Sequence, residues 1–267
     1  MRVSGICALS CVAFWATLLH PISETNAEPA SRPTTRPTPY TSPDPRSPKP
    51  GSRHGDVHQH PPIDCPLRKQ GIDPTKLKPF ESVQRYIRFL EQPSRAVWQK
   101  PDRVVARLKL APTDRVADVG AGGGYFAFRL AKAVPRGVVY AVDIEPEMLR
   151  HIHHTSMTSG VSNIRVVLSS AADPKLPEVV DVVFICDVLH HVHQRALFLA
   201  NTVKKLRSGG RFVLIEFKEG RLPKGPPEKV KIPRRRLFAL ARAAGLRLER
   251  EVTGLLPYQH FLIFRKP

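Results

Sequence analysis

The chain has 267 residues, enough for one mid-sized domain with additional segments. Lysine and arginine number 42 against 23 aspartates and glutamates, which gives a formal net charge of +19. Such a charge suggests a nucleic acid or an anionic surface as partner. The basic residues are scattered, however, with only Arg234-Arg235-Arg236 as a tight run, and no nucleic-acid motif accompanies them. We therefore expect a solvated basic surface and no specific nucleic-acid binding.

The first 27 residues have the pattern of a secretory signal peptide. Arg2 gives a minimal charged start, and the apolar run from Ile6 to Leu19 is too short for a comfortable membrane span. Thr25-Asn26-Ala27 places a small residue where a signal peptidase would cut. We expect an exported protein, periplasmic or secreted, with no transmembrane span after cleavage. A buried helix, a misplaced start codon or an uncleaved signal that anchors the protein in the membrane are the alternatives.

Residues 28–62 are predicted to form a disordered or polyproline-like tether. They are rich in Pro, Ser, Thr and Arg and have almost no large apolar side chains to offset the entropy of ordering. Three histidines at the end of this segment, at 54, 58 and 60, are a weak metal signal, and no metal site is predicted. Cys186 lies in an apolar run and is expected to be a packed thiol.

Residues 63–110 are predicted to be a helical preamble. Val83, Ile87 and their apolar neighbours share one helix face, which we expect to break at Pro93. A second helix is expected after Pro101. Between the two lies Trp98, which either covers a ligand or packs against the core.

Residues 111–267 alternate short apolar strands with helices, a pattern that predicts a parallel sheet covered by helices. The expected strands are residues 116–119, 138–142, 163–168, 181–186 and 211–217, followed by a terminal pair at 246–252 and 260–264. Helices are expected at residues 125–133, from Pro146 to near Gly160, at 196–203 before Ser208-Gly209-Gly210, and at 237–244. Residues 220–233 are expected to be a loop.

The first of these strands feeds a glycine-rich turn, with glycines at positions 120, 122 and 124. A strand, a tight turn and a helix together present backbone N–H groups to a ligand that approaches closely. A dinucleotide fingerprint would need its third glycine at position 125, where the chain has Tyr125. At the end of the second strand, Asp143 suits a ribose diol, which is common to NAD and S-adenosylmethionine.

The pattern Asp118-x-Gly120-x-Gly122-x-Gly124 resembles the first motif of class I S-adenosylmethionine-dependent methyltransferases. Residues 80–267 are similar to exported bacterial methyltransferases of the broad type 11 group. The shared phrases are Trp98-Gln99-Lys100-Pro101, Gly124-Tyr125-Phe126, Leu189-His190-His191 and Leu256-Pro257-Tyr258-Gln259. The resemblance implies an α/β, Rossmann-like fold, with a seven-stranded, mostly parallel sheet, an antiparallel end and helices on both faces.

The same resemblance implies S-adenosylmethionine as cofactor, held by residues in the glycine turn and at the strand ends. These residues are Asp118, Gly120, Ala121, Gly122, Gly124, Tyr125, Asp143, Ile144, Ala172, Asp173 and Asp187. Within this set, the resemblance places Asp173 against the adenine amino group, although this aspartate equally suits a turn cap.

The implied function is transfer of a methyl group to an unidentified small-molecule acceptor. A non-catalytic binding protein for S-adenosylmethionine is one alternative. An NAD(P)-dependent oxidoreductase is another, disfavoured by the missing glycine and the lack of a Tyr-x-x-x-Lys pair. Neither the acceptor nor the oligomeric state follows from the sequence.

Two adjacent histidines, His190 and His191, follow the fourth strand at the edge where open α/β sheets bind ligands. They are candidates for acceptor binding or proton removal. The alternative is that they start a helix and make local hydrogen bonds. A metal site formed with His193 ranks lower, because adjacent strand residues point to opposite faces.

We predict cleavage near Ala27, which leaves the Pro-rich tether at the new N-terminus, because a small residue follows a short apolar stretch. Mass spectrometry of the protein from its native source checks this. Intact Met1 in a soluble cytosolic pool would contradict it.

Overall fold

The computed structural model describes residues 66–73 and 76–267. The predicted signal peptide and the predicted tether lie outside these residues, so both stay predictions, as do the domain boundaries. None of the helices within the described part of the chain is long and apolar enough to cross a membrane.

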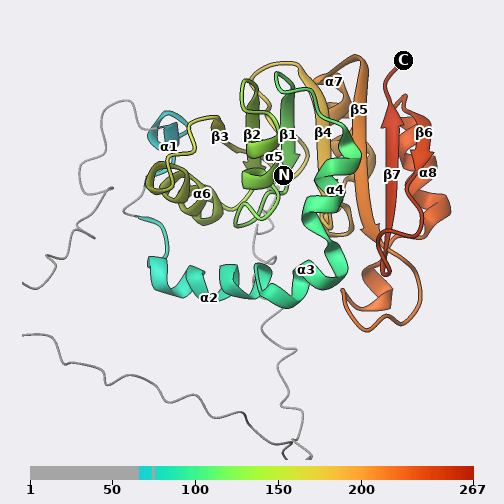
Figure 1. The fold of residues 1–267 in the computed structure, drawn as a ribbon, viewed down its shortest axis with the longest axis horizontal. Helices are drawn as coiled ribbons and strands as arrows, with labels where there is room; N and C mark the ends of the chain where they lie inside the picture. Colours follow the sequence, from blue (N-terminus) through green and yellow to red (C-terminus); the bar gives the residue numbers. More distant parts are fainter. Residues whose placement is uncertain (1–65, 74–75) are drawn as a thin grey trace, which may run out of the picture. The chain divides into compact units, whose positions relative to one another are not determined.

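A seven-stranded sheet forms the centre of the fold, with strand order β3-β2-β1-β4-β5-β7-β6 (Figure 1). The strands are β1 (Arg115–Val119), β2 (Val138–Asp143), β3 (Ile164–Leu168), β4 (Val180–Cys186), β5 (Leu206–Phe217), β6 (Arg247–Glu251) and β7 (Gln259–Arg265). The first five run parallel, and β7 is antiparallel to both β5 and β6. The predicted mostly parallel sheet with an antiparallel end is therefore confirmed.

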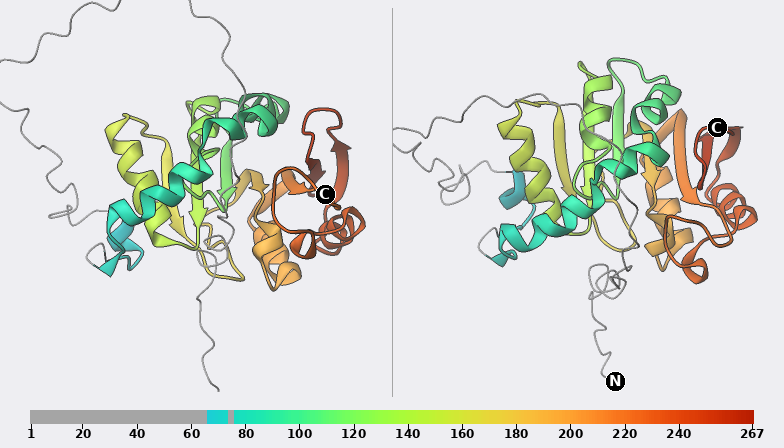
Figure 2. Two further views of the ribbon diagram at one scale, coloured as in Figure 1. Left: turned by 90° about the horizontal axis from the view of Figure 1, so that it is seen from below. Right: turned by 60° about the horizontal axis from the view of Figure 1, so that its bottom comes forward.

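Helices cover both faces of this sheet, which is why its central strands are mostly apolar on both faces. One core packs the sheet against α4 (Pro101–Leu108), α5 (Ala127–Ala133) and α6 (Pro146–Thr158). The other packs it against α7 (Arg195–Lys204) and α8 (Arg234–Ala243). Figure 2 shows the two helix layers in views turned from that of Figure 1.

Three further helices precede α4: α1 (Pro66–Lys69), α2 (Phe80–Leu90) and α3 (Pro93–Gln99). Here one expectation was incomplete, because Pro93 ends α2 and also begins α3. Proline suits the first helical position, where its missing N–H has no partner to lose. Val83 and Ile87 of α2 are buried against Met148 of α6. This contact lays α2 across the end of the sheet (Figure 1).

Two other boundaries differ from expectation. Ser208-Gly209-Gly210 lies inside β5, and α7 already ends at Lys204. Gly209 stays in the strand because its N–H donates to the carbonyl of Lys266, next to β7. The predicted loop at 220–233 contains a short 3-10 helix, η4 (Glu228–Val230), and a second one, η3 (Leu189–His191), follows β4.

Candidate cofactor and acceptor site

The glycine turn after β1 has a backbone that few other residues adopt. Gly120, Gly122 and Gly124 have φ angles of +79°, +55° and +94°. A Cβ atom at Gly120 would lie 2.2 Å from Cγ2 of Val188, and one at Gly124 would lie 2.7 Å from Cε2 of Phe128. At Gly122 the nearest atom would be 3.6 Å away. Packing therefore excludes a side chain at Gly120 and Gly124, whereas a Cβ at Gly122 would make only an ordinary contact with Leu90.

Asp143, at the end of β2, is hydrogen-bonded to this turn. Gly122 N–H donates to its Oδ2 atom at 2.8 Å, and Glu145 N–H donates to its Oδ1 atom at 2.9 Å. Burial raises the pKa of Asp143, while the backbone donors favour its charged form. Each carboxylate oxygen has two acceptor positions, so the group still has room for the two hydroxyls of a diol.

Parallel pairing brings the other predicted strand-end residues to the same edge. β1 lies between β2 and β4, which places Asp118 beside both neighbouring strands. Asp143 pairs with Leu168, so the segment that contains Ala172 and Asp173 leaves β3 next to it. Ile144 is 40% exposed there, an unusual position for a large apolar side chain.

Asp173 takes part in the local turn, since its Oδ1 atom accepts the N–H of Lys175 at 2.8 Å. This is the turn role that the sequence left open. Its contact with an adenine group stays a prediction.

Asp118 is buried near a cationic and aromatic pair. It is 3% exposed, and burial followed by the charge of Asp143 raises its pKa to about 7. Its Oδ2 atom and the hydroxyl of Tyr125 are buried with no hydrogen-bond partner within residues 66–73 and 76–267. The Arg95 guanidinium lies 4.3 Å from the centre of the Tyr125 ring. A free acceptor, a free hydroxyl and a guanidinium together suit a ligand that carries both an ammonium and a carboxylate.

Asp187, after β4, is held by amides from two distant segments. Gln99 Nε2 donates to its Oδ2 atom at 2.9 Å, and Gln259 Nε2 lies 2.7 Å from both of its oxygens. Burial, followed by the charge of Glu216, raises the pKa of Asp187 to about 6. Its φ of +60° is rare for a residue with a side chain and marks a position under strain.

Trp98 is half-buried and packs against two aromatic side chains of the fold, and its role in covering a ligand stays a prediction. Its ring centre lies 5.8 Å from that of Phe217 and 6.1 Å from that of Tyr258. The Phe217 ring lies 6.4 Å from that of His190. We call these four residues, Trp98, Phe217, Tyr258 and His190, the ring cluster. Within this cluster Phe217 and His190 are buried, whereas Trp98 and Tyr258 are partly exposed.

The two candidate histidines have different environments. His190 is buried, and its Nδ1 atom lies 2.8 Å from Oε2 of Glu216, whose other oxygen, Oε1, accepts the N–H of Leu189. Burial alone would lower the pKa of His190, but the hydrogen bond and charge of Glu216 outweigh it and raise the pKa. His191 is exposed on one side, and its ring lies 4.1 Å from that of His190. Partial burial and the charge of His190 lower the pKa of His191.

His190 therefore favours the charged form and His191 the neutral form. His191 is exposed and neutral near pH 7, so it is the one of the two that can accept a proton from a ligand, and its pKa of about 4 makes it a weak base. His190, held by Glu216, also makes the local contacts of the 3-10 helix η3, as the alternative reading expected.

Sequence reasoning missed the roles of Glu216, Arg95, Gln99 and Gln259. Glu216 had a visible signal, because it is the one acid in the apolar run Phe212–Phe217. The two glutamines stood in phrases already singled out, but their shared partner Asp187 depends on the folded chain.

Comparison with known proteins bears directly on this site. Residues 117–214 match a family model described as a methyltransferase domain. The chain is 31% identical, over 118 residues, to a ubiquinone/menaquinone biosynthesis C-methyltransferase of Syntrophotalea carbinolica, covering 43% of this chain and 48% of that protein. It is 36% identical, over 77 residues, to a probable ribosomal RNA small subunit methyltransferase A of Methanosarcina barkeri, covering 29% and 25%. The chain thus spans between a quarter and a half of these relatives' lengths.

Among solved structures, an S-adenosylmethionine-dependent methyltransferase from Aquifex aeolicus superposes with a TM-score of 0.63 and 25% identity. The match covers 70% of this chain and 98% of that one. The sheet order, the glycine turn and these matches agree with one another. The chain therefore carries a methyltransferase domain with the fold of the class I S-adenosylmethionine-dependent methyltransferases.

Proposed function

We propose that this chain transfers the methyl group of S-adenosylmethionine to a small, planar acceptor at the carboxyl edge of its sheet. The observation that carries the proposal is the hydrogen bond from Gly122 N–H to the Asp143 carboxylate, at a glycine where a Cβ would make only an ordinary contact. A ligand can therefore approach the backbone of Gly122 closely. The Asp143 carboxylate keeps acceptor positions for the hydroxyls of a ribose.

The residues beside this turn fit the remainder of the cofactor. The methionine part of S-adenosylmethionine carries an ammonium and a carboxylate. The unpartnered Oδ2 atom of Asp118 suits the ammonium, and Arg95 with the Tyr125 hydroxyl suits the carboxylate. The half-exposed side chain of Ile144, next to Asp143, offers an apolar surface to the adenine.

When bound, the cofactor would supply a methyl group carried by a sulfonium, whose sulfur becomes a neutral thioether when an acceptor displaces it in line. The protein's part is to place the acceptor and exclude water. An acceptor hydroxyl must also lose its proton, and the neutral, partly exposed His191 is placed to take it. Glu216 holds His190, and His190 in turn supports the ring of His191.

The ring cluster favours a planar, conjugated acceptor. Aromatic side chains bind flat rings through offset or edge-to-face contacts. Trp98 and Tyr258 are both partly exposed and lie together beside Asp187 and the two histidines. Among the relatives, one is named for quinones and another for ribosomal RNA. Quinones and RNA bases both have flat rings that aromatic side chains bind, so the ring cluster fits a planar group of either kind.

A non-catalytic protein that binds S-adenosylmethionine is the second candidate. Asp187 fits it, because the amides of Gln99 and Gln259 hold this carboxylate in place, which is a structural role that needs no catalysis. The two proposals differ in one result. Both proposals predict cofactor binding. Only an enzyme would transfer the tritiated methyl group of labelled S-adenosylmethionine to members of a panel of phenols and hydroquinones.

We predict that Asp143→Ala weakens S-adenosylmethionine and S-adenosylhomocysteine alike, since both carry the same ribose. Loss of hydrogen bonds to a charged group costs about 1.5–3 kcal/mol, or roughly ten- to a hundredfold in affinity. Gly122→Val should abolish binding by placing a side chain where the ligand approaches the backbone, with the fold intact by circular dichroism. Calorimetry on the full chain, with NAD as a third titrant, measures these effects.

Gly160→Val is the matched control for Gly122→Val. Gly160 also has a positive φ, +70°, and no atom within 4 Å of a Cβ, but it follows α6 far along the chain from the turn. Its variant should bind like wild type. If the Gly122 and Asp143 variants also bind like wild type, the cofactor lies elsewhere.

We also predict that affinity for S-adenosylmethionine rises between pH 6 and 7.5. Because the pKa of Asp118 is raised to about 7, this acid is mostly protonated and neutral at the lower pH. The ligand's ammonium favours the ionised form, so affinity should rise about five- to tenfold as Asp118 loses its proton. Calorimetry across this range should show the slope in wild type and lose it in Asp118→Asn. A slope that survives in the variant would assign the titration to another group.

The third prediction concerns the histidines. With an acceptor from the tritium panel, His191→Gln should lower kcat by about a hundredfold or more, as expected for loss of a general base. Affinity for the cofactor should not change. His193→Gln, an exposed neighbour, is the control and should keep full activity. His190→Gln should lower both turnover and melting temperature, because it removes the imidazole that pairs with the buried Glu216 carboxylate. Unchanged turnover in both the His190 and His191 variants would remove the pair from the mechanism.

A further inference from the structure

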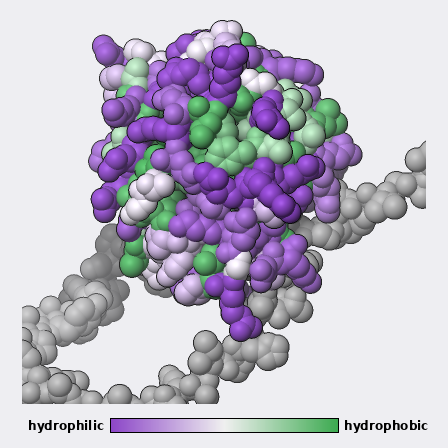
Figure 3. Space-filling model, turned by 90° about the vertical axis from the view of Figure 1, so that its right-hand side faces the viewer, coloured by the Kyte–Doolittle hydropathy of each residue, from purple (hydrophilic) through white to green (hydrophobic). Residues whose placement is uncertain are grey.

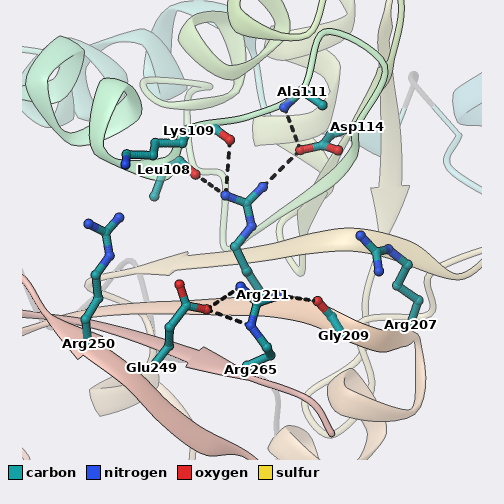
Figure 4. A pocket seen from close by; sticks show the side chains of 10 residues that line it. All are labelled: Leu108, Lys109, Ala111, Asp114, Arg207, Gly209, Arg211, Glu249, Arg250 and Arg265. Carbon is teal, nitrogen blue, oxygen red and sulfur yellow. Dashed lines mark hydrogen bonds and ion pairs between the residues drawn. The ribbon is translucent and has the colours of Figure 1, made fainter.

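A cavity of about 570 Å³ lies at the end of the sheet opposite the glycine turn, where the parallel strands begin (Figure 4). We call it the amino-edge cavity. It is lined by five cationic side chains, Lys109, Arg207, Arg211, Arg250 and Arg265, and by two acidic ones, Asp114 and Glu249. The lining therefore has a net positive charge.

Three parts of the chain meet at this cavity: the end of α4 with the segment that leads to β1, the start of β5, and the β6–β7 pair. A register shift between Leu248 and Arg250 in β6 explains one feature of the lining. Successive strand residues normally point to opposite faces, but a bulge changes that alternation. Glu249 and Arg250 both line the cavity as a result. Figure 3 shows the side of the molecule that carries β6 and α8, which is largely hydrophilic around a hydrophobic area.

Three of the arginines have structural partners that account for them, and the first, Arg207, pairs with Asp181. Arg211 donates to the carbonyl of Lys109 and to Oδ2 of Asp114, which joins β5 to the segment before β1. Arg265 pairs with Glu249 and donates to the carbonyl of Gly209 (Figure 4). These bonds hold the walls of the cavity together.

Arg250 and Lys109 have donors to spare. Arg250 donates from one amino group to the carbonyl of Arg107, but its Nε–H is buried with no acceptor among the described residues. This buried donor without a partner is unfavourable but is shielded from solvent. The other amino group, Nη1, makes no hydrogen bond within the described residues and is the donor left for a ligand. No hydrogen bond or ion pair of the Lys109 ammonium is found within the same part of the chain. The two side chains come from different elements and line one cavity.

We propose that the amino-edge cavity binds a phosphate-bearing anion through Lys109 and Arg250. Phosphate oxygens accept the several N–H donors of a guanidinium, and an ammonium adds a compact positive charge. Positively charged side chains on the edge strand β6 also prevent a strand of another molecule from pairing with it. This accounts for the exposed charges of β6. It does not explain why Lys109, at the end of α4, lines the same cavity.

This site is separate from the cofactor site. Asp114, which lines the cavity, stands just before β1, and Gly120 of the glycine turn stands just after it. A strand of this length separates the two by roughly 20 Å. The proposal therefore does not depend on methyl transfer.

The test uses the full chain and tripolyphosphate as probe, with calorimetry at low salt. Wild type should bind the probe, and the double variant Lys109→Gln/Arg250→Gln should bind it about tenfold more weakly or worse. Arg235→Gln/Arg242→Gln, on the exposed surface of α8, removes the same charge and is the matched control. It should stay within about twofold of wild type. Circular dichroism verifies that all variants are folded.

A second arm replaces tripolyphosphate with a twelve-nucleotide single-stranded RNA, to distinguish a free phosphate compound from a phosphate polymer. Loss of RNA binding in the double variant, together with competition by tripolyphosphate, would identify the polymer as a source. Saturating S-adenosylhomocysteine should leave probe binding unchanged. The proposal is overturned if wild type does not bind tripolyphosphate, if both double variants weaken it equally, or if S-adenosylhomocysteine displaces it.

Discussion

The contact on which the site depends is the hydrogen bond from Gly122 N–H to the Asp143 carboxylate. It joins the turn after β1 to the end of β2, so two neighbouring parallel strands end in one connected structure. Gly120 and Ala121 N–H groups both donate to the carbonyl of Val142, which strengthens the same junction. The turn is therefore ordered before any ligand binds. Binding loses no affinity to the entropy of ordering this turn.

Acidic groups are concentrated at the carboxyl ends of the parallel strands, and burial makes their ionisation unfavourable. Asp118, Asp143 and Asp187 all have pKa values raised by desolvation. The chain offsets this with backbone N–H donors at Asp143, amides at Asp187 and the nearby charge of Arg95. Such an arrangement is stable yet ready to receive a cation, which is what a sulfonium cofactor with an ammonium group requires.

The two ends of the sheet carry different chemistry for a topological reason. Parallel strands gather all their carboxyl ends at one edge, and there the chain places acids, aromatic rings and histidines. Their amino ends, together with the antiparallel β7 and edge strand β6, gather arginines instead. A formal charge of +19 is thus compatible with an acidic cofactor edge, because charge and chemistry are separated along the strands.

The sequence by itself determined the strands, the glycine turn and the position of Asp143, because these rest on local periodicity and on spacing along a short segment. It also indicated the antiparallel end, through the two apolar runs near the C-terminus. Only the tertiary structure decided that Pro93 begins a helix, that Glu216 holds His190, and that Gln99 and Gln259 share Asp187. Those partners are separated by 26 to 88 residues. No local pattern encodes such pairings, since they arise only when parallel pairing and helix packing bring distant segments to one edge.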